Sequence, residues 1–209
     1  MKYLSIFTLI VLFVGPITAQ DETLFNDEIE SGGYGGPICK IGQINGNTGI
    51  FFGGQGGWII NHSFALGGKG YVLASPMDIK NLQNISVGFA CGGVLLEYII
   101  ASSKLLHFNI ECMIGASGVY NDVINYAQYH DPIDYTGDAG LIIEPGFNLN
   151  LNITRYLRIA AGFTYRIING IDYDAGAPYR NIIGNDYENI SDSDLSGVSA
   201  QLVIKFGKF

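Results

Sequence analysis

Apolar and polar residues alternate along much of this 209-residue chain, so that neighbouring side chains belong to opposite faces. A period of two is typical of a β-strand with one apolar and one polar face, and a helix would not keep it over so many residues. The alternation is clearest over residues 138–153, 157–173 and 195–209. In the first two of these segments the apolar parity holds Leu141, Ile143, Phe147, Leu149, Leu151, Ile153, Ile159, Ala161, Phe163, Tyr165, Ile167 and Ile171. The pattern therefore predicts an all-β protein.

Eight such runs, separated by turn residues, follow one another along the chain. The predicted strands are Gly36–Ile44, Thr48–Ile60, Phe64–Ala74, Ile85–Ala101, His107–Tyr120, Asp138–Ile153, Leu157–Tyr173 and Leu195–Phe209. The alternation slips at Gly92-Gly93, which predicts a β-bulge. Pro145 lies inside the sixth run and predicts a bulge or a locally open edge there, because proline has no backbone donor.

The connections between these runs alternate in length from the second onward. Short turns at 61–63, 102–106 and 154–156 alternate with longer loops at 75–84, 121–137 and 174–194. Transmembrane barrels of outer membranes have short periplasmic turns and longer outer loops. We therefore expect an antiparallel up-and-down barrel of eight strands, with both termini in the periplasm.

The N-terminal residues 1–19 have the features of a cleaved secretory signal peptide. Lys2 precedes the apolar run Tyr3–Val14, and a break with small residues follows before Gln20. The apolar run is too short to span a membrane as a helix. Residues 20–35, first acidic and then glycine-rich, are interpreted as a flexible periplasmic arm, and residues 36–209 as the barrel domain.

Composition narrows the class of protein further. Without residues 1–19 the chain has 10 basic and 19 acidic residues, a formal charge of −9, which makes it a poor binder of nucleic acid. Its three cysteines, Cys39, Cys91 and Cys112, are too few and too far apart for a disulfide framework or a zinc site. Charged residues make up 14% of the chain, against roughly 25% in soluble domains.

Alternation alone fits both a lipid-facing barrel and a soluble lipocalin-like barrel. Two observations favour lipid on the outside. The polar parity carries mostly Gly, Asn, Ser and Thr, whereas a water-exposed surface usually carries roughly 25–35% charged residues. Tyrosines also gather near the predicted strand ends, as in the aromatic girdles of membrane barrels: Tyr98, Tyr120, Tyr156 and Tyr173.

The signal peptide, the eight alternating runs and the aromatic C-terminus Lys205-Phe206-Gly207-Lys208-Phe209 resemble the small outer-membrane barrels of the OmpA transmembrane domain and OmpX class. The glycine-rich stretch from Gly42 to His62 also resembles uncharacterised outer-membrane proteins of Bacteroidota. The resemblance implies an eight-stranded barrel in the outer membrane of a Gram-negative bacterium. The chain departs from that class at its last residue, because Phe206 lies on the apolar parity and Phe209 does not.

The polar parity of the predicted barrel collects charges that would face the interior. Its members are Glu97, Glu111, Glu144, Arg158, Arg166 and Lys205, with Lys69, Gln55 and Gln201 as further candidates. An interior of eight strands is just wide enough to be filled by side chains, and charges buried there must pair. We interpret this set as a salt-bridged plug. Glu144 and Arg166 are expected to pair if the sixth and seventh strands have a register sum near 310.

Other motifs could in principle carry chemistry in the loops. Tyr129-His130-Asp131 with Asp134 and Asp138 has the residue types that activate water in outer-membrane proteases, which have wider barrels. The acids Asp172, Asp174, Asp186, Glu188, Asp192 and Asp194 could gather cation ligands but lack the spacing of an EF-hand. Gly53–Gly57 is followed by no GK[ST] phosphate motif, and close strand packing explains these glycines better. We therefore predict no catalytic, cofactor or metal residues.

The function expected from the sequence is structural and interactive. A non-enzymatic barrel would contact outer-membrane lipid, lipopolysaccharide or a larger outer-membrane complex through its acidic loops and its arm. Two alternatives stay open: a barrel that binds lipid or a small ligand, including a soluble carrier, and an enzyme that modifies lipid A.

Overall fold

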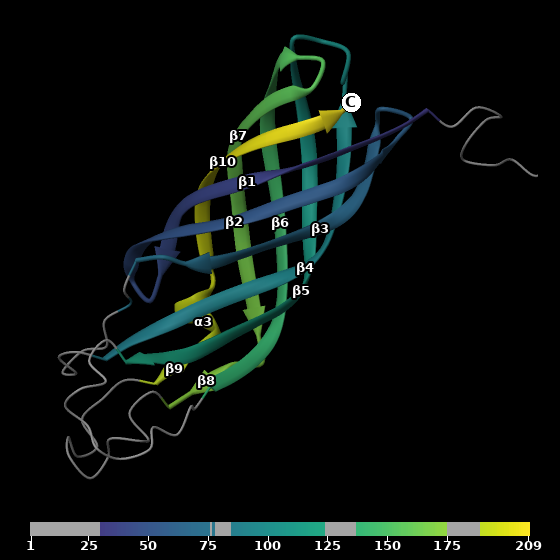
Figure 1. Cartoon of the computed structure of the whole chain (residues 1–209). Coiled ribbons are helices and arrows are strands. Elements are labelled where there is room, and N and C mark those ends of the chain that lie inside the picture. Colours follow the sequence, from purple (N-terminus) through teal and green to yellow (C-terminus); the bar gives the residue numbers. More distant parts are fainter. Residues whose placement is uncertain (1–29, 76, 78–84, 124–136, 175–188) are drawn as a thin grey trace, which may run out of the picture.

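The computed structural model describes residues 30–75, 77, 85–123, 137–174 and 189–209. Within them, eight long antiparallel strands close into one barrel, in the order β1-β10-β7-β6-β5-β4-β3-β2 (Figure 1). These strands are β1 (Ser31–Ile44), β2 (Asn47–Ile60), β3 (Phe64–Leu73), β4 (Ile85–Ile100), β5 (Leu106–Val123), β6 (Gly137–Thr154), β7 (Leu157–Asn169) and β10 (Gly197–Lys208). The predicted fold class is confirmed. The signal peptide and residues 20–29 of the arm lie outside the described residues.

Three short elements lie at one end of the barrel, beside the connection from β7 to β10 (Figure 1). The strands β8 (Asp172–Tyr173) and β9 (Ile190–Ser191) pair with each other, and α3 (Asp192–Leu195) follows directly. The end of the barrel that holds these three elements is called the loop end. The opposite end is called the turn end. It holds the tight connections after β2, β4 and β6, the start of β1 and the C-terminus. No helix among the described residues is long and apolar enough to span a membrane.

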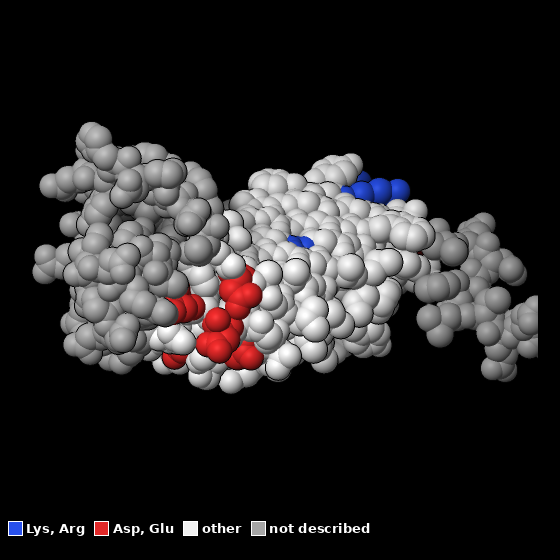
Figure 2. All heavy atoms as spheres, turned by 90° about the horizontal axis from the view of Figure 1, so that it is seen from below, with Lys and Arg blue, Asp and Glu red and all other residues white. Residues whose placement is uncertain are grey.

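The wall of the barrel is apolar on its outside. Phe163, Phe206 and Leu141 are 65%, 56% and 67% exposed, and they alternate along their strands with buried neighbours. Figure 2 shows a nearly uncharged middle on the face in view, with acidic atoms gathered beside the loop end and basic atoms near the opposite end. The predicted assignment of apolar residues to the outer face is therefore confirmed for β5, β6, β7 and β10.

Two details of the first half differ from the sequence prediction. Ser31–Gly35, interpreted as part of the arm, form the first residues of β1 and pair with β2. The bulge at Gly92-Gly93 is absent, since the pairing of β4 with β3 and β5 runs through both glycines without a shift. The alternation only looks broken there because Val87 and Phe89, nearer the loop end, are buried apolar residues of the interior face.

Close strand packing in this half depends on glycine. A Cβ added to Gly36 would lie 1.7 Å from the carbonyl oxygen of Ile204 on β10, and one added to Gly53 would lie 2.0 Å from that of Gly70 on β3. Neither contact is possible for a larger residue without moving the backbone. The glycines of β1 and β2 thus allow the sharp coiling that closes a barrel of only eight strands.

In the second half, one of the two predicted arrangements is present at Pro145, and the predicted end of β7 is wrong. β6 and β7 keep a single register across Pro145, but the ladder has no pairs between Ile143↔Ile167 and Gly146↔Thr164, so the edge is locally open rather than bulged. β7 also ends at Asn169 instead of reaching Tyr173. Gly170 has a φ of +101° and turns the chain, so Ile171 is buried although its parity predicted lipid contact.

The interior has an apolar layer at the loop end and a polar layer in the middle. Buried side chains from most strands, from β8 and β9 and from α3 make the apolar layer: Ile44, Phe51, Tyr71, Met77, Val87, Phe89, Met113, Val119, Ile142, Ile168, Ile171, Tyr173, Ile190 and Leu195. A smaller cluster of Tyr34, Ile59, Ala65 and Ile99, with Phe209 packed against it, lies at the turn end. The buried carboxylates and the lysines that bind them lie between these two apolar clusters.

Candidate functional site: the charged interior of the barrel

All six residues predicted for the interior are buried in the structure, Glu144 and Arg166 completely. Two further lysines are buried with them. Among the described residues the buried charges are the cations Lys40, Lys69, Arg158, Arg166 and Lys205 and the anions Glu97, Glu111 and Glu144. An isolated charge in such a place would cost several kcal/mol, so the partners of each group decide what the interior can do.

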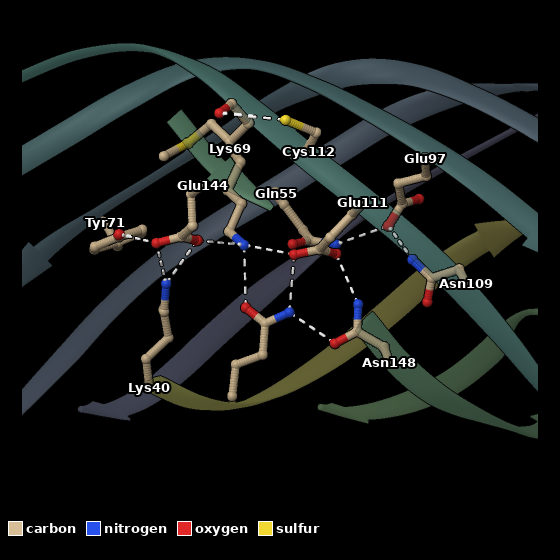
Figure 3. Close-up of polar contacts among 12 residues, drawn as sticks. Lys40, Gln55, Lys69, Tyr71, Glu97, Asn109, Glu111, Cys112, Glu144 and Asn148 are labelled. Atoms are coloured by element: carbon tan, nitrogen blue, oxygen red, sulfur yellow. Dashed lines mark hydrogen bonds and ion pairs between the residues drawn. The ribbon is translucent and has the colours of Figure 1, made fainter. Parts of the chain in front are cut away.

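Glu144 on β6 lies near the apolar layer and accepts hydrogen bonds from side chains on two other strands (Figure 3). Lys40 Nζ on β1 donates to both carboxylate oxygens, at 2.7 and 2.6 Å. Tyr71 on β3 donates its hydroxyl to the same group, and the Lys40 ammonium also lies 4.0 Å from the centre of the Tyr71 ring. These contacts cross the barrel rather than joining neighbouring strands.

Lys69 on β3 bridges two carboxylates in the middle of the barrel (Figure 3). Its Nζ lies 2.7 Å from Glu111 Oε1 and 3.0 Å from Glu144 Oε1. Two amide side chains also donate hydrogen bonds to the Glu111 carboxylate, Gln201 Nε2 at 2.9 Å and Asn148 Nδ2 at 2.8 Å. One cation therefore neutralises part of two buried anions, and the amides satisfy the remaining oxygen lone pairs.

Glu97 on β4 is the carboxylate nearest the turn end. Lys205 Nζ donates to Oε1 at 2.7 Å and the Tyr34 hydroxyl to Oε2 at 2.6 Å. The amides of Asn109 and Gln55 complete this shell at 3.1 and 3.4 Å. Each of the three interior carboxylates thus accepts hydrogen bonds from at least one lysine ammonium and at least one neutral donor.

The predicted pair of Glu144 and Arg166 is wrong, although the predicted register sum of 310 between β6 and β7 is correct. Glu144 binds lysines from β1 and β3, and Arg166 instead donates to two backbone carbonyls. Its Nε lies 2.5 Å from the oxygen of Leu195 in α3, and its Nη2 lies 2.8 Å from that of Gln43. The guanidinium also faces the rings of Phe51 and Phe89 in the apolar layer. Arg166 therefore fastens α3 and β1 to the barrel wall.

Arg158 lies at the turn end, where its guanidinium stacks 3.9 Å from the centre of the Phe209 ring. Phe209 in turn stacks on Tyr34, with ring centres 6.3 Å apart. The C-terminal residue thus turns inward, as its parity predicts, and covers the interior at this end.

Asp138, Asp192 and Asp194 at the loop end accept hydrogen bonds from backbone amides. Asp192 accepts from the amides of Gly170 at 3.1 Å and Ile171 at 2.7 Å, and Asp138 accepts from that of Asp172 at 2.9 Å. Asp194 forms a capping box with Ser191 at the start of α3. No group of three His, Cys, Asp or Glu side chains among the described residues could hold a metal ion. Residues 129–134, Asp186 and Glu188 lie outside the described part of the chain.

The sequence prediction missed Lys40, Tyr34 and Tyr71 as members of the interior network. Both faces of β1 carry apolar residues, so its alternation does not reveal the inner face. A usable signal was present, because Lys40 is the only Lys, Arg, Asp or Glu between residues 31 and 68. A charge in a strand of a lipid-facing barrel must point inward, whatever the pattern around it.

The closed antiparallel barrel with an apolar outside and an ion-paired interior has the fold of the small eight-stranded outer-membrane β-barrels. It is similar to Neisserial surface protein A, with a TM-score of 0.55, 10% sequence identity and coverage of 88% of this chain and 100% of that chain. It is also similar to the N-terminal β-barrel domain of OprF from Pseudomonas aeruginosa, with a TM-score of 0.50, 9% identity and coverage of 86% and 99%. No protein-family model matches the chain, and no curated protein matches it in sequence.

Proposed function

We propose that this chain is a non-enzymatic integral protein of a bacterial outer membrane that acts through contacts made at its ends. The observation that carries the proposal is the continuous outer band of exposed apolar side chains around a closed barrel. Exposed Leu, Ile, Phe and Val in that number would aggregate in water, and lipid is the solvent that suits them. Every wall strand is at least ten residues long, enough to span a bilayer when tilted.

The interior argues against a soluble carrier of apolar ligands. Such a carrier needs an empty apolar cavity inside and a charged exterior, and this barrel has the reverse arrangement. The described interior is filled by Lys69, Glu111 and Glu144 and their amide partners, with an apolar layer above them. The same filling supports a structural or binding role over passage of solutes.

The saturated carboxylates support the non-enzymatic part of the proposal. A general acid or base needs access to a substrate, but Glu97, Glu111 and Glu144 are all buried and accept from fixed donors. Such a network stabilises one arrangement of strands. We therefore assign the interior to stability and look for interactions at the two ends.

We place both termini in the periplasm and the loop end outside the cell. This orientation follows the general rule of short periplasmic turns and longer outer loops. The acids beside the loop end would then meet lipopolysaccharide, divalent cations or a partner in a larger outer-membrane complex (Figure 2).

Cell fractionation and vesicle flotation of the full-length chain test the membrane location. We expect the folded protein to remain with the membrane after washes with high salt and with alkaline carbonate, and to float with vesicles. A charged membrane-surface protein would be released by these washes. Recovery of folded protein in the soluble fraction without detergent would contradict the proposal. Labelling of single cysteines at Ser193 and at Arg155, both exposed, in intact cells tests the orientation, and only the first position should react.

A further inference from the structure

A cavity of about 490 Å³ opens at the turn end of the barrel, between the β4–β5 turn, the β6–β7 turn and the C-terminus. Its volume lies within the range of about 300–1,000 Å³ that is common for ligand sites. Three cationic side chains, Arg155, Arg158 and Lys208, line it together with hydroxyl groups of both turns, and its lining contains no Asp or Glu. This is the chemistry that recognises an anion.

No Asp or Glu side chain in the lining neutralises the cations of this cavity. Arg158 is 8% exposed and stacks on Phe209, and it forms no ion pair with a described carboxylate. The nearest interior acid along the barrel, Glu97, already accepts from Lys205. The buried charges as a group comprise five cations and three anions among the described residues, so the interior has a formal excess of two positive charges. An anion at the mouth would offset that excess.

The outer wall beside the cavity is apolar and aromatic. Leu105 and Tyr156, on the two turns that border the cavity, are 67% and 66% exposed, and Leu106 is exposed beside them. A ligand with an anionic head and an apolar tail could therefore place its tail against this wall and its head over the rim. A soluble anion would use the cations and leave the apolar wall unused.

We propose that this cavity binds the phosphate of an anionic phospholipid from the periplasmic leaflet. Guanidinium and ammonium groups donate to the phosphate oxygens from Arg155, Arg158 and Lys208, and the acyl chains lie against Leu105 and Tyr156. Basic pockets at the edges of membrane proteins bind lipid head groups by the same forces. The inference rests on the membrane location and orientation proposed above.

Native mass spectrometry of the folded full-length chain in a neutral detergent tests the site. The probes are phosphatidylglycerol, zwitterionic phosphatidylcholine and inorganic phosphate, each titrated separately. We expect one phosphatidylglycerol to be retained in preference to phosphatidylcholine, and free phosphate to compete only in large excess. Arg155→Gln and Lys208→Gln should each lower retention about five-fold, the effect of one cation at an anionic lipid surface.

Lys104→Gln is the matched control, because Lys104 is an exposed cation on the β4–β5 turn that does not line the cavity. It removes the same charge and should leave retention within about two-fold, since only a diffuse surface attraction is lost. An equal loss in all three variants, or no preference for phosphatidylglycerol, would overturn the site. Equal competition by inorganic phosphate would overturn the lipid as its ligand. Flotation with phosphatidylcholine vesicles separates these results from failure of the membrane location itself.

Discussion

Glu97 and Glu111 lie directly opposite each other on β4 and β5, with both carboxylates inside the barrel. Like charges in such a cross-strand pair are destabilising by themselves. Here each acid has its own lysine from outside the hairpin, Lys205 on β10 for Glu97 and Lys69 on β3 for Glu111. The stability of this hairpin therefore depends on lysines that other strands supply.

Lys40 and Glu144 should be strongly coupled in a double-mutant cycle. Lys40→Met leaves Glu144 with less compensation and should cost roughly 3–5 kcal/mol, whereas adding Glu144→Leu should recover part of that loss. Urea unfolding of the barrel in vesicles, followed by the heat-modifiable gel shift, measures both. The control cycle of Arg166→Met with Glu144→Leu should give a smaller coupling energy, because Arg166 donates to Leu195 and Gln43 instead. A larger coupling in the control would refute the observed pairing.

Gly36 and Gly35 are neighbours on β1 and should respond differently to alanine. The new Cβ at Gly36 would lie 1.7 Å from the carbonyl oxygen of Ile204, but at Gly35 its nearest neighbour is 3.9 Å away. Gly36→Ala should cost at least about 1–3 kcal/mol and reduce the folded fraction, because β1 and β10 can no longer close at this spacing. Gly35→Ala should fold like the wild type in the same refolding assay. Similar yields for both variants would contradict the close approach.

Phe163 tests whether the outer band faces lipid. It lies at the centre of β7 and is 65% exposed, so Phe163→Arg should cost about 2–4 kcal/mol if it lies at the middle of a bilayer. Tyr156→Arg, at the strand end, should cost no more than about 1 kcal/mol. Denaturant titration in vesicles gives both values. In a soluble barrel both arginines would be tolerated equally, which is the result that would exclude the lipid-facing assignment.

Asp192 should hold the connection between β7 and β10 in place. Asp192→Ala removes the acceptor of two hydrogen bonds from the amides of Gly170 and Ile171 and should cost about 1.5–3 kcal/mol, the usual range for a bond to a charged group. Hydrogen exchange should become faster at these two amides while that of Phe163 is unchanged. Asp172→Ala removes the same charge from an exposed side chain and should leave exchange at Gly170 as in the wild type.

The sequence predicted the strands well because a lipid-facing barrel repeats one simple constraint. Outward residues must be apolar, so parity alone locates Phe163 on the outside and Glu144 on the inside. The prediction failed at Ile171, where the positive φ of Gly170 takes the chain off the wall and the parity rule no longer applies. It also failed at Gly92-Gly93, because the inner face of β4 carries buried apolar residues on both sides of these glycines, among them Phe89 and Leu95, and this hides the alternation.

The partners inside the barrel could not be predicted in the same way. Register gives the residues opposite each other on neighbouring strands, and it correctly places Arg158 opposite Asn152. A long side chain in a narrow barrel can also reach strands on the far side, and that reach depends on the tilt and stagger of all eight strands. Lys40 reaches Glu144 across a sequence separation of 104 residues, which no pairwise reading of adjacent strands reveals.

The seam between β1 and β10 joins the first and last wall strands of the chain. Lys69 and Gln201, which share one hydrogen bond, are 132 residues apart. Contacts between residues this distant in sequence slow folding, because the chain loses conformational entropy before the contact contributes any stabilising energy. The hairpin of β4 and β5 cannot neutralise its own buried charges, since it brings in the buried acids Glu97 and Glu111 and no lysine. A chain that lacks β10 therefore lacks Lys205 for Glu97 and Gln201 for Glu111, so the shells of these two buried acids are complete only once the last wall strand is in place.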